Sequence, residues 1–291
     1  MSLKENDNIK VPENLNDYID KGIKKGIDHK SKNKNSSLIK VASIVLISGG
    51  IVTTASNIPV LANELVKIPV IGEIVKVLDF TNSTQFGGVI TDGNKIVIDS
   101  LNKNNINIYF TDNGKLATNA PHYEVEYREY PYTLVFKFSG VRYIDPTYVE
   151  HKVKQLPFVK DAYNIMVLDD SSYKVAIELN ENIDFKISEY KDPAMIDIKV
   201  KTNSKNTTSK EAYFIRTENL EYGEQLAFTE ELLFGYDKLG VQKSSDDKYV
   251  VQLGPYKTEA EAKEELDKII KDNNLGVNLF VESRKSGEGP K

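Results

Sequence analysis

Hydrophobic and polar positions change their pattern three times along the chain of 291 residues. The first apolar block, "VASIVLISGGIVTTASNIPVLA" over residues 41–62, holds no charged residue in 22 positions. At about 1.5 Å per residue, a helix of this length would cross a hydrocarbon core of about 30 Å. We therefore expect a transmembrane helix over 41–62. The alternatives are a cleaved signal peptide with an unusually long leader and a buried core helix.

Lysine residues give the expected orientation of this helix. Residues 1–40 carry nine Lys and six Asp or Glu, a net charge of +3, so the rest of the chain carries −8 of the total of −5. An excess of lysine marks the cytoplasmic side of a span. We expect residues 1–40 to form a cytoplasmic tail in a single-pass cell-membrane protein. A juxtamembrane segment, 63–84, and the later domains would be extracytoplasmic.

Apolar residues recur at helical spacing within the tail, over residues 11–30. Pro12 stands in the first turn, where a helix tolerates proline. The apolar stripe of this helix would face either the lipid bilayer or a groove in a cytoplasmic protein. Its members are Leu15, Tyr18, Ile19, Ile23 and Ile27.

Short alternating runs of apolar and polar residues begin near residue 85, and such runs are typical of strands. The residues of "YTLVFKF" that share one face are Tyr132, Leu134, Phe136 and Phe138. We expect an antiparallel, sandwich-like domain over 85–202. One helix is expected within it, over residues 146–156.

The last part of the chain has strand and helix patterns in the order βαββαβ, after a polar linker at 203–211. Thr258 and Glu261 have the spacing of a capping box at the start of the second helix. Two helices on one side of a four-stranded sheet would leave its other face open. This pattern predicts a ferredoxin-like domain over 212–285 and a disordered end at 286–291.

Residues that would support catalysis are scarce. The chain has no Cys, and its three His lack metal-ligand spacing. It contains no P-loop, no nucleophile elbow and no zinc-protease motif. The acidic character of the residues after 40 argues against nucleic-acid binding. We therefore expect no enzyme activity, no catalytic residue, no metal site and no cofactor.

Two stretches near the start of the chain carry a family resemblance. "IKVPENLNDYIDKGIKKG" and "IPVIGEIVKVLDF", on either side of the apolar block, are similar to a family of short-tailed, single-pass, anti-sigma-factor-like membrane proteins of Gram-positive bacteria. The resemblance covers about residues 9–80. It implies that the apolar stripe of the tail binds a sigma factor, and it favours this protein partner over lipid.

The stretch "YVVQLGPYKTEAEAKEEL" resembles the second half of SPOR domains, which bind peptidoglycan glycans that lack stem peptides. The resemblance covers residues 212–284 and rests on Gly254, Pro255 and Tyr256. The glutamine that ends the first strand in that family is replaced here by Arg216. The residues that strand alternation would present to a glycan on the open face are Arg216, Val250 and Gln252. Alternatively, Arg216 is a solvated residue of the sheet.

Together these patterns favour a membrane-anchored α+β protein. It would have one transmembrane helix, a β-rich, sandwich-like outer domain and a C-terminal ferredoxin-like, SPOR-like domain. The expected function is envelope signalling, in which the tail binds a sigma factor and the outer part senses or binds the cell wall. The alternative function is a structural peptidoglycan-binding SPOR protein, anchored in the membrane, that acts in sporulation or division.

Overall fold

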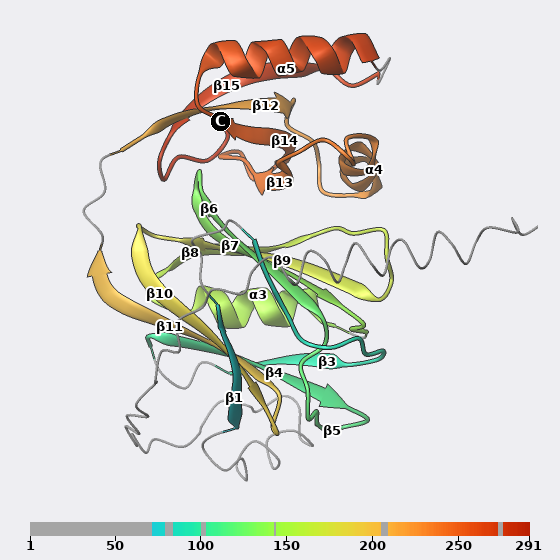
Figure 1. Cartoon of the computed structure of the whole chain (residues 1–291), viewed down its shortest axis with the longest axis vertical. Helices are drawn as coiled ribbons and strands as arrows, with labels where there is room; N and C mark the ends of the chain where they lie inside the picture. Colours follow the sequence, from blue (N-terminus) through green and yellow to red (C-terminus); the bar gives the residue numbers. More distant parts are fainter. Residues whose placement is uncertain (1–71, 79–83, 100–102, 143, 205–208, 273–275) are drawn as a thin grey trace, which may run out of the picture. The chain divides into compact units, whose positions relative to one another are not determined.

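The computed structural model describes residues 72–78, 84–99, 103–142, 144–204, 209–272 and 276–291. All of them belong to one compact unit, Gly50–Lys291. Within these described ranges the chain forms three antiparallel sheets and three helices (Figure 1).

Two of the sheets form a β-sandwich. One has the order β1-β10-β11-β4-β3, with β5 beside β4, and the other has the order β2-β6-β7-β9-β8. The strands of the first sheet are β1 (Glu73–Leu78), β3 (Lys95–Asp99), β4 (Asn105–Asp112), β5 (Lys115–Leu116), β10 (Ile183–Lys191) and β11 (Met195–Ser204). Those of the second are β2 (Thr84–Gly87), β6 (Tyr123–Glu129), β7 (Tyr132–Ser139), β8 (Val159–Ile165) and β9 (Ser172–Leu179).

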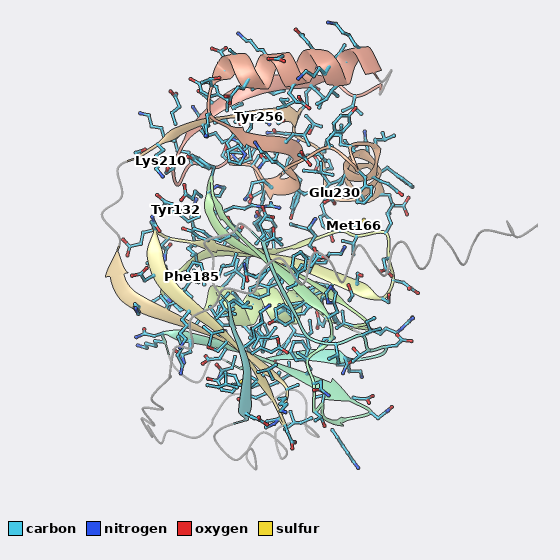
Figure 2. All side chains as sticks on the ribbon, viewed as in Figure 1. Tyr132, Met166, Phe185, Lys210, Glu230 and Tyr256 are labelled. Carbon is cyan, nitrogen blue, oxygen red and sulfur yellow. The ribbon has the colours of Figure 1, made fainter. Side chains whose placement is uncertain are left out.

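The core of the sandwich contains side chains from both sheets. Leu134, Phe136 and Phe138 of β7 share one buried cluster with residues of β4, β10 and β11. The rings of Phe110 and Phe138 lie 5.7 Å apart across it. At the edge of this core, Phe185 of β10 (labelled in Figure 2) packs on Tyr127 of β6, with ring centroids 5.1 Å apart.

Helix α3 (Pro146–Lys154) packs against β8 and β3, which belong to different sheets. The Asp145 carboxylate caps it by accepting a hydrogen bond from the Tyr148 amide at 3.1 Å. Val149 and Val153, four residues apart, are buried in the sandwich core. The helix therefore lies within the range in which the sequence predicts one.

The third sheet belongs to a βαββαβ module and has the antiparallel order β13-β14-β12-β15. Thr258 Oγ1 accepts a hydrogen bond from the Glu261 amide at 3.2 Å, at the predicted helix start. Figure 1 shows α5 lying along one face of this sheet. The elements are β12 (Glu211–Thr217), α4 (Glu224–Leu232), β13 (Leu239–Lys243), β14 (Tyr249–Tyr256), α5 (Glu259–Asp272) and β15 (Leu279–Lys285).

The expected fold class, a membrane-anchored α+β protein, is wrong. The described residues form a β-rich fold, and none of the helices found there combines the length and the apolar character that a membrane crossing requires. The expected single-pass membrane localisation is not supported and is corrected with it. The expected span rests on the absence of charged residues over 41–62. Six of these residues are nevertheless Ser, Thr or Asn, which are polar. The expected span, 41–62, the tail, 1–40, and residues 63–71 lie outside the described residues.

Asp246 organises the turn between β13 and β14 and makes stability depend on pH. Its carboxylate accepts hydrogen bonds from Ser244 Oγ at 2.6 Å and from Asn219 Nδ2 at 3.0 Å. These bonds lower its pKa from 3.8 to about 2. A carboxyl group with a lowered pKa in the folded state stabilises that state above its unfolded pKa, and this contribution is lost as the pH falls through the folded pKa.

We therefore expect Asp246→Asn to reduce the loss of stability that the original chain shows between about pH 4 and about pH 2. Urea unfolding at several pH values in this range measures the slope of the free energy of unfolding against pH. The matched control is Asp267→Asn on the exposed side of α5, which should keep the slope of the original chain. Identical slopes for Asp246→Asn and the original chain would contradict the role of this turn.

Candidate functional site

The sheet face opposite α5 carries the three residues that the sequence predicts as glycan contacts. Arg216 of β12 and Gln252 of β14 are directly paired across the sheet, and Val250 lies two residues before Gln252 on the same face. All three are buried, with exposed fractions of 6%, 4% and 0% for Arg216, Gln252 and Val250. The structure thus brings these residues together on one face but leaves little of them exposed. Their role in glycan binding stays a prediction.

Two further residues of this face, Glu282 and Arg284 on β15, complete a polar cluster. Arg284 donates hydrogen bonds from Nη1 to Gln252 Oε1 at 2.7 Å and from Nε to Glu282 Oε2 at 2.6 Å. Arg216 Nε lies 3.3 Å from the same Glu282 oxygen. We call Arg216, Gln252, Glu282 and Arg284 the sheet-face cluster.

The sheet-face cluster has more positive than negative charge. Burial lowers the pKa of Arg284 to about 10, and the Glu282 carboxylate opposes this shift. Each guanidinium also stacks on a ring, Arg284 on Phe214 at 4.4 Å and Arg216 on Phe280 at 4.7 Å. The strand pattern alone did not identify Glu282 and Arg284 as members of this face. The alternation of Phe280, Glu282 and Arg284 along "LFVESRK" is the signal that could have found them.

A pocket of about 300 Å³ lies beside the sheet-face cluster. Its walls come from β6 and the residue after it, from β12, from the start of β13 and the residue before it, and from β14. The rings of Tyr130 and Phe214 meet edge to face, with centroids 5.6 Å apart, and form its apolar wall. The polar and aromatic residues of the lining include Glu126, Arg128, Tyr130, Phe214, Lys238 and Gln252.

Arg128 fixes one polar wall of the pocket. Its guanidinium donates hydrogen bonds to the Val241 carbonyl at 2.8 Å and to Glu126 Oε2 at 2.7 Å. Burial acts to lower the pKa of Arg128, but the Glu126 carboxylate, together with Tyr163 and Glu230, raises it overall. Gly240 permits this approach, because a Cβ atom there would lie 2.7 Å from Arg128 Nη2.

Lys238 supplies a second cation at the pocket. Its ammonium group donates a hydrogen bond to the Pro255 carbonyl at 3.1 Å and lies 4.8 Å from the centre of the Tyr256 ring. The side chain is exposed. It can therefore turn toward a ligand without leaving a buried charge unpaired.

Buried and half-buried polar contacts join the strands behind the pocket. Gln242 Nε2 donates to the Tyr163 hydroxyl at 2.5 Å, and Lys243 Nζ forms an ion pair with Asp161 at 2.9 Å. Tyr163 and Val135 share a buried cluster with residues of β13 and β14. For this reason Val135 is only 4% exposed, although strand alternation places it opposite the sandwich core.

The pocket has the chemistry of a binding site for a polar organic ligand. Across the described ranges of the chain, no group of three or more His, Cys, Asp and Glu could hold a metal ion. The aromatic wall offers apolar contact, and Arg128, Lys238 and Gln252 offer hydrogen-bond donors. Glu126 and the amide oxygen of Gln252 offer acceptors.

The expected sigma-factor contacts lie in a part of the chain that the structure does not describe. They are Leu15, Tyr18, Ile19, Ile23 and Ile27. Sigma-factor binding and both family resemblances therefore stay predictions. No protein-family model matches the chain, and no curated protein or solved structure is detectably similar to it.

Proposed function

We propose that the chain is a non-catalytic carbohydrate-binding protein and that its pocket binds part of a peptidoglycan glycan. The observation that carries this proposal is the combination of an aromatic wall, Tyr130 and Phe214, with the polar groups of Arg128, Lys238 and Gln252 in one pocket. A sugar ring has an apolar C–H face and a rim of hydroxyl groups. On the protein, an aromatic ring is complementary to the C–H face of the sugar, and directed polar groups are complementary to its hydroxyl groups.

The volume and the charged residues of the pocket restrict the range of possible ligands further. Its volume of about 300 Å³ is at the lower end of the roughly 300–1,000 Å³ that small-ligand pockets have. It therefore suits a terminal unit of a glycan better than a long segment. Acidic Glu126 and Glu129 accompany basic Arg128 and Lys238 in its lining, so a hydroxyl-rich ligand finds both acceptors and donors.

The sequence resemblance of residues 212–284 to SPOR domains supports the same ligand class. Arg216 occupies the position of the glutamine that this family uses, and a guanidinium can only donate hydrogen bonds. Gln252 is the direct cross-strand partner of Arg216 and also lines the pocket. We propose that Gln252 supplies the amide that Arg216 lacks.

The variant Lys238→Ala tests the proposed site. We expect it to bind glycan strands without stem peptides about tenfold more weakly than the original chain, because it loses one charged hydrogen bond to the ligand. Isothermal titration calorimetry measures the affinity.

The matched control is Lys263→Ala, because Lys263 is an exposed lysine of α5 that pairs with Glu259. Its affinity should equal that of the original chain. Equal affinities for all three proteins, or no binding to any of them, would rule out this pocket as the glycan site.

A further inference from the structure

Part of the sheet face opposite α5 is covered by a short segment at the end of the described residues. We call this segment, residues 286–291, the strap. Its composition, "SGEGPK", predicts a disordered end, but its residues make ordered contacts with several elements. Pro290 is buried.

Main-chain hydrogen bonds hold the strap at both ends. The Ser286 amide donates to the Lys210 carbonyl at 2.9 Å, and the Gly287 amide donates to the Glu129 carbonyl at 2.8 Å. Near the other end, the Ser245 amide donates to the Pro290 carbonyl at 3.0 Å. The strap therefore runs from the β6–β7 hairpin to the β13–β14 turn.

The last residue of the strap contacts the sheet-face cluster directly. The Lys291 amide donates a hydrogen bond to Glu282 Oε1 at 3.2 Å. The Lys291 main-chain oxygen accepts one from Arg216 Nη2 at 2.9 Å and one from Asn219 Nδ2 at 3.3 Å. One main-chain oxygen thus occupies the position in which Arg216 and Asn219 would together hold an anionic oxygen.

The cluster has donor capacity that the strap does not use. Arg284 Nη2 is buried without a hydrogen-bond partner among the described residues, and Arg216 Nε is buried with only the ion-pair contact to Glu282 Oε2 at 3.3 Å. Arg284 is 1% exposed and Arg216 is 6% exposed. Two guanidinium groups share one carboxylate, Glu282, so the buried charge of these three side chains is positive. Buried cations without a full set of partners favour an additional anion.

We propose that Arg216 and Asn219, with Arg284 adding positive charge behind them, form a carboxylate-binding subsite and that the strap occupies it in the absence of ligand. The subsite rests on the proposed glycan function, because Gln252 belongs to both the cluster and the pocket. Its ligand group is a carboxylate carried by a sugar. An acidic sugar displaces the strap, and its carboxylate takes the place of the Lys291 oxygen. The apparent affinity for the acidic sugar is the affinity of the strap-free form multiplied by the fraction of molecules in which the strap is released.

A reversible crosslink tests this subsite in the chain of 291 residues. The original chain has no Cys, so Ser245→Cys with Pro290→Cys introduces a single possible disulfide across an existing hydrogen bond. The probes are N-acetylmuramic acid, which carries a carboxylate, and N-acetylglucosamine, which does not. Calorimetry measures both affinities in the oxidised and the reduced protein, and a variant that lacks residues 286–291 provides a second comparison.

We expect the reduced protein and the strap-less variant to bind N-acetylmuramic acid at least tenfold more tightly than the oxidised protein. The affinity for N-acetylglucosamine should change less than twofold. Equal affinity of the oxidised and reduced proteins for the acidic sugar would overturn the proposal. An equal gain for both sugars would also overturn it, because the strap would then only restrict access.

Measuring the binding of acetate distinguishes the carboxylate subsite from the proposed glycan function. If acetate binds only when the strap is released, and glycan strands do not bind at all, the carboxylate subsite stands and the glycan function falls. If glycan strands bind in a manner that depends on Lys238, and release of the strap leaves acidic-sugar binding unchanged, the glycan function stands and the subsite falls.

Discussion

The variant Glu282→Ala is expected to lower the free energy of unfolding by about 3–5 kcal/mol, the range found when one partner of a buried ion pair is removed. Glu282 is the carboxylate that faces both Arg216 and Arg284, at 3.3 Å and 2.6 Å. The side chains of Glu282, Arg216 and Arg284 are 11%, 8% and 0% exposed, so water cannot replace the lost oxygen atoms. Urea unfolding at neutral pH, followed by far-ultraviolet circular dichroism, measures the loss.

Glu264→Ala is the matched control for this variant. Glu264 is a carboxylate of the same module, but its side chain is 73% exposed and it pairs with Lys268 on the surface of α5. An exposed pair of this kind contributes about 0.3–0.5 kcal/mol. If the two variants lost equal stability, the sheet-face cluster would not be a buried charged network.

The variant Arg128→Met is expected to lower the free energy of unfolding by about 2–3 kcal/mol, the cost of leaving buried hydrogen-bonding groups without partners. It removes the donors to the Val241 carbonyl and to Glu126. Val241 is 0% exposed, so neither the methionine nor water restores the bond to its carbonyl, whereas the Glu126 side chain is 35% exposed and stays partly solvated. Differential scanning calorimetry measures the change in unfolding temperature.

Arg142→Met is the control, because Arg142 is 38% exposed and its partners Asp92 and Asp170 are 72% and 86% exposed. We expect it to change stability by less than about 1 kcal/mol. A smaller loss for Arg128→Met than for Arg142→Met would contradict the structural role given to Arg128 in the pocket wall.

Strand and helix positions could be predicted where local patterns determine them. In β7, alternation correctly placed Leu134, Phe136 and Phe138 in the sandwich core. It could not show that Val135, on the opposite side, is also buried, because the cluster that contains it includes residues of β13 and β14, more than 100 positions later. The pattern of one strand shows which residues share a face but not which distant segment packs on it.

The candidate site could be predicted only in part for the same reason. Alternation placed Arg216, Val250 and Gln252 on one face, and the structure agrees. The strap that covers Arg216 is held largely by main-chain hydrogen bonds, which glycine-rich composition does not reveal. The pocket wall from β6 depends on tertiary contacts of Arg128 and Tyr130 that no local pattern encodes.

The proposed role of the pocket beside the sheet-face cluster is glycan binding. Nuclear magnetic resonance of the isotope-labelled chain, titrated with glycan strands that lack stem peptides, tests this claim most directly. We predict that the largest amide shift changes occur at Gly240, Gln252 and Gly254, which line the pocket. Unchanged shifts at these three residues, while glycan binding is observed by calorimetry, would contradict the claim.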